Sequence, residues 1–182
     1  MVGASGLASC AAFSCNIILE IGERSALTEV FVIGSSAILA VLPEPPEGIL
    51  TATRDVDIIP PNGDERMADR ISFVIGEASP FDVEYGYYAQ GVSFKIPTYA
   101  PSGWQARTVD LPVGKIVAHC MESHDVVLSK LGAGREKDLE FASAAAALSL
   151  VERSVLFGRL SLVPATAEHL NLIDQRISAL FM

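Results

Sequence analysis

The sequence predicts an α/β fold in the α+β sense: a small mixed sheet flanked by helices, with further helices at the C-terminal end. Short apolar runs of strand length alternate with stretches of helical spacing over residues 1–120. Residues 121–182 carry helical patterns only. We therefore expect a core at 1–120 and a helical part at 121–182 packed on it, in a single compact unit, because this length suits one hydrophobic core.

The composition narrows the class of protein. Half of the 182 residues are hydrophobic, yet no uninterrupted apolar run is long enough to span a bilayer, and residues 1–15 lack the basic start of a secretory signal. Cys10, Cys15 and Cys120 have no metal-ligand spacing and leave one cysteine over, so we expect reduced thiols in the cytoplasm. The net charge of −9 disfavours broad nucleic-acid binding, which needs many Lys and Arg.

The elements expected in the first part follow from periodicity and from turn residues. Apolar residues at helical spacing predict an N-terminal helix with Ile17, Ile18 and Ile21 on one side. Asn62-Gly63 predicts a turn, after which Asp64 serves as a helix N-cap. In order, we expect a helix at about 7–24, a strand at 30–33, a helix at 37–42, a strand at 53–59 and a helix at 64–75.

After residue 75 the hydrophobic periodicity becomes irregular. Residues 79–102 hold all four tyrosines and no clear helical spacing, and we expect a long loop with short strands there. A strand pair at 107–111 and 115–119 should turn around residues 112–114. Helices are then expected at 122–131, 135–151, 153–162 and 166–181.

Two carboxylates lie on the second expected strand. Side chains of a strand alternate between its faces, so Asp55 and Asp57 should share one face while Val56 and Ile58 occupy the other. Two like charges this close repel, and solvent, an arginine, a shared proton or a divalent cation can relieve the repulsion. Mg²⁺ is commonly held by one or two carboxylates together with nucleotide phosphates. The alternative is a solvated edge strand of an acidic protein.

The turn Gly34-Ser35-Ser36 separates the first expected strand from the helix that follows. Glycine lets the backbone approach a ligand closely, and N–H groups at the start of a helix face an anion. Gly34, Ser35 and Ser36 are therefore candidate phosphate-binding residues. The alternative is a turn with an ordinary N-cap.

A second polar cluster surrounds the glycine turn at residues 132–134. Lys130 lies one turn before the end of an otherwise apolar helix, which suits a lysine that binds phosphate at the edge of the core. Arg135 is the second basic candidate for nucleotide binding. The alternative is a solvated corner between two helices, where Arg135 and Lys137 pair with Glu136 and Asp138.

Aromatic and histidine residues support weaker interpretations. The tyrosines of residues 85–88 could stack on a base, but half-buried loop anchors are the commoner role, and the same holds for Trp104. His119 and His124 have no metal-ligand partners at useful spacing, so we expect structural histidines.

The order of these motifs resembles an uncharacterised bacterial nucleotidyltransferase-like family related to the AbiEii toxins of type IV toxin–antitoxin systems. The resemblance covers about residues 20–155 and is most specific at 124–138. It rests on Val32-Ile33-Gly34-Ser35-Ser36-Ala37-Ile38-Leu39, Asp55-Val56-Asp57, Phe81, Gly86-Tyr87-Tyr88-Ala89-Gln90-Gly91-Val92, Gly103-Trp104, His124-Asp125, Ser129-Lys130-Leu131 and Ala133-Gly134-Arg135-Glu136-Lys137-Asp138.

The resemblance implies a nucleotidyltransferase core of the DNA polymerase beta type. Gly34 and Ser35 would hold the triphosphate, and Asp55 and Asp57 would bind Mg²⁺, with room for a two-ion site. Lys130 would contact nucleotide phosphates. Asp138 would match the downstream aspartate of the AbiEii-type toxins, as a base or as a residue that orients the lysine.

The implied function is Mg²⁺-dependent transfer of an NMP from an NTP to an RNA, such as a transfer RNA end, or to a protein, in a toxin-type enzyme with an antitoxin partner. Apolar C-terminal helices would suit a homodimer. The superfamily generally uses a third carboxylate, for which Asp82, Glu84 and Asp110 are candidates. If none reaches the metal, the alternative is a catalytically inactive module that keeps the fold for nucleotide binding or protein interaction.

Overall fold

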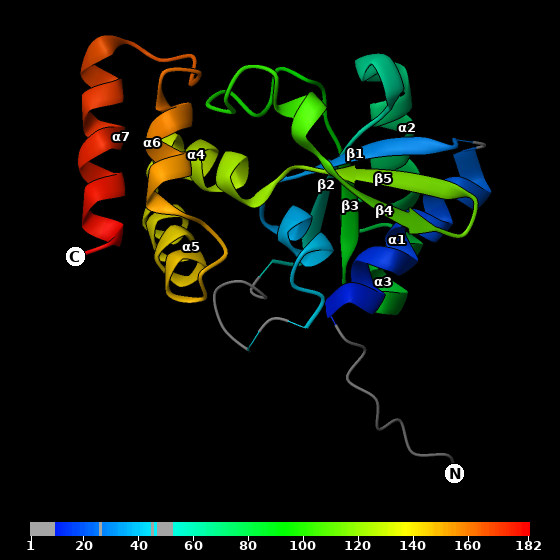
Figure 1. The fold of residues 1–182 in the computed structure, drawn as a ribbon. Helices are drawn as coiled ribbons and strands as arrows, with labels where there is room; N and C mark the ends of the chain where they lie inside the picture. The colour runs from blue at the N-terminus through cyan, green and yellow to red at the C-terminus, as the bar shows by residue number, and fades with distance from the viewer. Residues whose placement is uncertain (1–9, 26, 45, 47–52) are drawn as a thin grey trace.

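The computed structural model describes residues 10–25, 27–44, 46 and 53–182. The elements that build the sheet and its helices come first in the chain (Figure 1). They are α1 (Cys10–Ser25), β1 (Glu29–Ile33), the 3-10 helix η1 (Ser35–Ala40), β2 (Asp55–Ile59), the 3-10 turn η2 (Pro61–Gly63), α2 (Glu65–Ile75), α3 (Pro80–Tyr85), β3 (Tyr88–Gly91), the 3-10 helix η3 (Trp104–Arg107), β4 (Val109–Val113) and β5 (Ile116–Cys120). Four helices follow: α4 (Ser123–Ala133), α5 (Glu136–Ala147), α6 (Arg153–Leu160) and α7 (Ala167–Leu180).

The five strands form one mixed sheet in the order β3-β2-β1-β5-β4. Strand β1 lies in the centre, antiparallel to β2 and parallel to β5. Strand β3 runs parallel to β2, and β4 runs antiparallel to β5. The predicted α+β fold with a mixed sheet is therefore confirmed.

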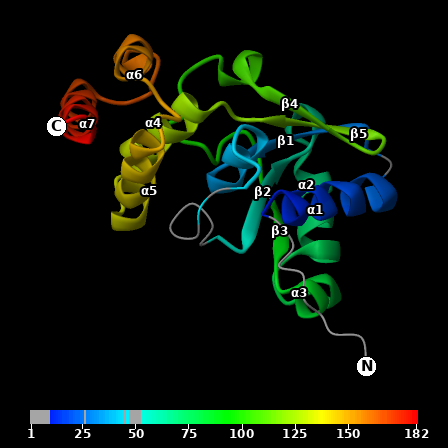
Figure 2. The same cartoon turned by 60° about the horizontal axis from the view of Figure 1, so that its bottom comes forward.

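The helices gather in two groups around this sheet. In Figures 1 and 2, α1, α2 and α3 lie around the sheet, whereas α4 to α7 lie together on the other side of the molecule. One hydrophobic cluster runs through both groups, from Ile17 and Ile21 of α1 through Val32 of β1 to Leu128 of α4. Because α4 shares this core with β1, its position relative to the sheet is determined by packing. No helix in the described ranges is long and apolar enough to cross a bilayer.

Two predicted segments differ from the structure. Residues 35–40 form a 3-10 helix, where an α-helix over 37–42 was expected. Residues 79–102 were expected to contain short strands and no helix; they contain the strand β3 but also the helix α3. Helix α3 is six residues long and depends on its ends, with a Ser79 N-cap and a left-handed Gly86 after it. So short a helix shows no apolar periodicity. The expected helix start at residue 7 lies outside the described residues.

Candidate active site

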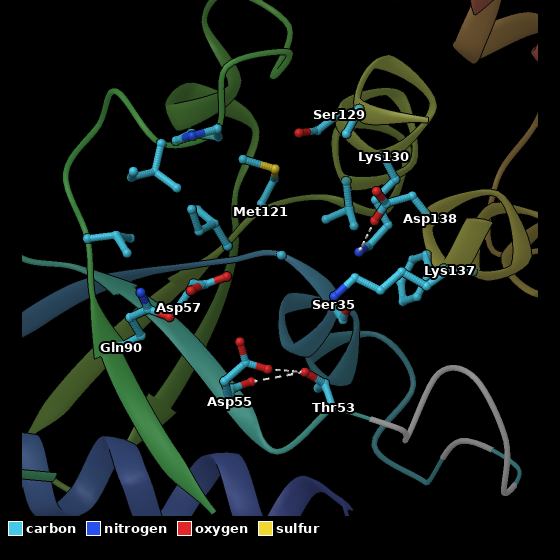
Figure 3. A pocket seen from close by; sticks show the side chains of 18 of the residues that line it. Ser35, Thr53, Asp55, Asp57, Gln90, Met121, Ser129, Lys130, Lys137 and Asp138 are labelled. Atoms are coloured by element: carbon cyan, nitrogen blue, oxygen red, sulfur yellow. Dashed lines mark hydrogen bonds and ion pairs between the residues drawn. The ribbon is translucent and has the colours of Figure 1, made fainter. Parts of the chain in front are cut away.

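A cleft of about 670 Å³ opens between the sheet and helices α4 and α5 (Figure 3). One wall comes from the ends of β1, β2 and β3 and includes Gly34, Asp55, Asp57 and Gln90. The facing wall comes from α4, α5 and the turn between them and includes Ser129, Lys130, Arg135, Lys137 and Asp138. The cleft thus brings together the two polar clusters that lie far apart in the sequence.

Asp55 and Asp57 both face this cleft from β2, while Val56 and Ile58 between and beyond them are fully buried. This is the period-two alternation that the sequence predicted. The Thr53 hydroxyl donates a hydrogen bond to the Asp55 carboxylate. The Asp57 carboxylate has no hydrogen bond or ion pair with any residue that the structure describes. Asp57 is therefore held in the cleft with its charge largely unmatched.

The pKa of Asp57 reflects this lack of a bonded cation. Burial, followed by repulsion from Asp55, raises the pKa of Asp57 to about 6, although Lys130, Lys137 and Arg135 partly offset the increase. A carboxylate that is buried beside another carboxylate favours a ligand that adds positive charge. The chemistry of the pair therefore fits a divalent cation with hard oxygen ligands.

The backbone at Gly34 passes close to the carboxylate of Asp57. Its φ of 71° and ψ of −157° lie in a region that side chains with a Cβ rarely adopt, and a Cβ built there would be 2.9 Å from Oδ2 of Asp57. Gly34 and Ser35 both line the cleft. Ser36, the third predicted phosphate-binding residue, does not line the cleft and is only 4% exposed.

The facing wall centres on Asp138, whose side chain is fully buried. Lys130 Nζ lies 3.2 Å from Oδ1 of Asp138, and Arg135 Nε lies 2.6 Å from Oδ2. Lys130 also lies over the ring of Phe141, 4.7 Å from its centroid. Asp138 thus binds two cations at the surface of the cleft. The sequence had left open whether this cluster forms a binding site or a solvated corner between two helices.

The pKa values of Asp138 and Lys130 reflect their burial and their ion pair. Burial acts to raise the pKa of Asp138, but hydrogen bonds and charge from Arg135 and Lys130 outweigh it, and the pKa is lowered. Burial lowers the pKa of Lys130, and attraction to Asp138 works against that decrease. A carboxylate held ionised by two cations is a weak proton acceptor.

None of the three candidate third carboxylates lines the cleft. Asp82 on α3 forms an ion pair with Arg54 at 2.7 Å, and Glu84 lies on the same helix. Asp110 lies on β4, at the opposite edge of the sheet from β3, and its Oδ1 is 2.7 Å from Nδ1 of His119. In the described part of the chain, no group of three His, Cys, Asp or Glu side chains is placed to hold a metal ion.

Gln90 instead lies beside the acid pair, since it is opposite Asp57 in the register of β2 and β3. Its amide also lines the cleft. Asp55 and Asp57 would therefore be the protein's carboxylate ligands, and substrate phosphates and water would complete the coordination of Mg²⁺. This residue set fits Mg²⁺, which usually keeps several waters and takes only one or two carboxylates.

Several residues that line the cleft were not predicted to be site residues from the sequence. Thr53, Gln90, Tyr99 and Lys137 all line the cleft. Thr53 had a usable signal, because it lies two residues before Asp55 and so shares the face of the acid pair. Gln90 had none, because only the pairing of β3 with β2 brings it there.

The aromatic residues divide between the two expected roles. Tyr88 and Tyr99 line the cleft, whereas Tyr85 and Tyr87 pack on Phe81 with centroid distances of 4.7 and 5.5 Å. Trp104 is buried against Phe31 and Phe94, and Nε2 of His124 accepts a hydrogen bond from the Glu152 amide at 2.8 Å. These residues act as structural anchors, as the sequence suggested for Trp104 and His124.

The sequence was compared with protein families, curated proteins and solved structures. A protein-family model described as a nucleotidyltransferase of unknown function (DUF6036) matches residues 15–163. No curated protein and no solved structure gives a significant match. The matched range includes both walls of the cleft, from Gly34 to Asp138.

Proposed function

Because the chain belongs to this family of nucleotidyltransferases of unknown function, we propose that it is a Mg²⁺-dependent enzyme that transfers a nucleoside monophosphate from an NTP to a hydroxyl of an RNA or a protein. One observation carries the proposal. The acid pair of β2 and the cations of α4 and α5 line the same cleft, close enough that Lys130 affects the pKa of Asp57. A nucleotide bound between these walls would meet both the metal ligands and the phosphate-binding groups.

Each residue has a defined task in this mechanism. Asp55 and Asp57 would hold Mg²⁺, which would neutralise the phosphates and polarise the α-phosphate. Gly34 leaves room for the substrate beside Asp57, and Thr53 orients the Asp55 carboxylate. Lys130 would contact the phosphates, positioned by Asp138. The acceptor hydroxyl loses its proton to solvent and attacks the α-phosphate in line as pyrophosphate leaves.

Calorimetry tests the binding part of this proposal. Each of the four NTPs is titrated into the wild type with and without Mg²⁺, and again into Asp57→Asn. We expect Mg²⁺-dependent binding that the substitution abolishes, because an amide is a much poorer ligand for Mg²⁺ than a carboxylate. No binding of any NTP to the wild type, or equal binding to the variant, would contradict the proposal.

A second function is favoured because none of the three candidate third carboxylates lines the cleft. With Gln90 opposite Asp57, the cleft could bind a nucleotide without transferring it, as a catalytically inactive module. Incubation with α-³²P-labelled NTP, Mg²⁺ and total RNA or protein separates the two. Label transferred to RNA or protein by the wild type but not by Asp57→Asn supports the enzyme. Tight binding without transfer supports the inactive module.

The AbiEii-type toxin role, with its antitoxin partner, is a finer part of the same proposal. It predicts that induced expression of the chain arrests bacterial growth and that Asp57→Asn relieves the arrest. Equal growth with the two proteins, at matched expression levels, would remove the toxin role and leave the transferase intact.

A further inference from the structure

Lys137 is a cation of the cleft that neither the motifs nor the family description assigns. It is the second residue of α5, is exposed, and lines the cleft. Figure 3 shows its side chain extending from α5 into the cleft in the direction of Ser35. Its charge also lowers the pKa of Asp57, second only to Lys130 among the cations that do so. Lys137 therefore faces the acid pair across the cleft.

The other cations of the cleft are already bound to carboxylates. Four cationic side chains line it in the described part of the chain: Arg54, Lys130, Arg135 and Lys137. Arg54 pairs with Asp82, while Lys130 and Arg135 share Asp138. Lys137 forms no hydrogen bond or ion pair with a described residue. It is thus the ammonium that a ligand can bind without breaking an existing pair.

The position of Lys137 in its helix also opposes a purely structural role. The N-terminal turn of a helix carries partial positive charge, so it favours Glu136 and Asp138 and disfavours a lysine. An unpaired lysine in this turn costs stability rather than adding to it. An anion in the cleft would reverse that cost.

The charges of the cleft match a triphosphate when Lys137 is counted. Arg54 is neutralised by its ion pair with Asp82. Among the other charged residues that line the cleft, Asp55, Asp57 and Asp138 balance Lys130, Arg135 and Lys137, so these six residues are neutral together. An NTP carries about four negative charges, which two Mg²⁺ ions neutralise, and a diphosphate carries about one fewer. Without Lys137, the complex with a triphosphate would keep one excess negative charge in a partly buried site.

We propose that Lys137 binds the terminal phosphates of the nucleotide and makes the site prefer triphosphates to shorter phosphate chains. This inference rests on the proposed nucleotidyltransferase function and extends it to the choice of substrate. The phosphates that Lys137 holds are those that leave as pyrophosphate, so it acts on the leaving group and not on the acceptor.

Calorimetry with inorganic tripolyphosphate and Mg²⁺ tests this contact without knowledge of the base. The proteins are the wild type, Lys137→Ala, Lys137→Arg and, as a matched loss of one exposed charge outside the cleft, Lys115→Ala. We expect Lys137→Ala to weaken binding about tenfold or more, as for a lost hydrogen bond between charged groups. Lys115→Ala should change it less than about twofold, because exposed charges at a distance are screened, and Lys137→Arg should stay near the wild type. Since Lys137 is exposed, these variants should fold, which circular dichroism checks.

A second titration locates the contact along the phosphate chain. Each of the four NTPs is compared with its NMP, and Lys137→Ala should weaken the NTP that binds while leaving the affinity for the NMP unchanged. Equal losses for NTP and NMP, or equal effects of Lys137→Ala and Lys115→Ala, would overturn the role of Lys137 while the nucleotidyltransferase proposal stands. If the wild type binds neither tripolyphosphate nor any NTP, both proposals fail.

Discussion

Two groups of buried carboxylates differ in whether cationic side chains neutralise them. Asp125 on α4 is fully buried, and its carboxylate is bound by Arg107 at 2.8 Å and by Arg159 at 3.0 Å. We call these three residues the arginine cluster. Asp57 on β2 is also largely buried, but its carboxylate has Asp55 beside it and no bonded cation among the described residues.

The difference separates charge that holds the fold from charge that awaits a ligand. The arginine cluster joins η3, α4 and α6, and each of its members has a partner. The acid pair forms no ion pair with another described element of the fold, and burial beside a like charge makes Asp57 costly to ionise. Substitutions should therefore have opposite effects on stability in the two regions.

The largest effect should come from Asp125→Ala. It leaves Arg107 and Arg159 partly buried without their shared carboxylate, and we expect a loss of about 2–4 kcal/mol in the free energy of unfolding. Urea denaturation measures it. Asp110→Ala, which breaks an exposed pair with His119, is the control and should cost less than about 1 kcal/mol. Equal losses in the two variants would mean that the arginine cluster has no special structural role.

Asp57→Asn should instead stabilise the ligand-free protein, by about 2–3 kcal/mol above neutral pH. The pKa of Asp57 rises on folding from 3.8 to about 6, so the folded protein binds a proton in this range that the unfolded chain does not. The contribution of Asp57 to stability therefore falls as pH increases from about 4 to above 6. The gain on substitution should be near zero at pH 4 and full at pH 8.

Thermal and urea unfolding at several pH values measure this difference. Asp69→Asn on the exposed face of α2 is the matched control and should show no such trend. A loss of stability in Asp57→Asn at pH 8 would contradict the view that the acid pair is uncompensated.

Gly34→Ala should disturb the acid pair more than the fold. The positive φ of Gly34 costs alanine about 1–2 kcal/mol, and the new Cβ would displace the Asp57 carboxylate. We expect a loss of that size in the free energy of unfolding, together with loss of Mn²⁺ or Mg²⁺ binding measured by calorimetry. Gly86→Ala, with a similar φ of 78° and open space at Cβ, should show the loss of stability alone. Unchanged metal binding in Gly34→Ala would mean that a Cβ at residue 34 does not displace the Asp57 carboxylate.

The smallest effect should come from Thr53→Val, which keeps the shape of the side chain but removes the hydroxyl that bonds Asp55. We expect metal binding to weaken a few-fold, as for the loss of one hydrogen bond of about 1 kcal/mol. Thr53→Ser keeps the hydroxyl and should bind metal like the wild type. If Thr53→Ser is as weak as Thr53→Val, packing of the methyl group and not the hydrogen bond orients Asp55.

Much of the fold could be predicted because its elements carry local patterns. The strand around Val56 and the helix that starts after Asp64 were expected close to their observed bounds. Helix α3 was missed because its Ser79 cap and Gly86 end define it, and six residues are too few for periodicity. Short strands were expected in this region, but the bounds of β3 were not predicted, because it is only four residues long.

Part of the candidate site could likewise be predicted from local sequence patterns, and part could not. Asp55 and Asp57 share a face because strand geometry requires it, and Gly34 precedes a helical turn as its sequence indicated. The position of the third carboxylate could not be derived. Asp110 does lie on a strand, but the strand order puts that strand at the far edge of the sheet.

The sequence by itself determined which residues could carry the chemistry: a pair of carboxylates on one strand face, a glycine turn, and a lysine at the end of a helix. Only the tertiary structure decided that these face one cleft, that Gln90 lies opposite Asp57, and that Lys137 remains unpaired there. The physical reason is the range of the interactions involved. Helical and strand periodicity act between near neighbours, whereas the cleft depends on the pairing of β3 with β2 and on the packing of α4 against the sheet, which join residues far apart in the chain.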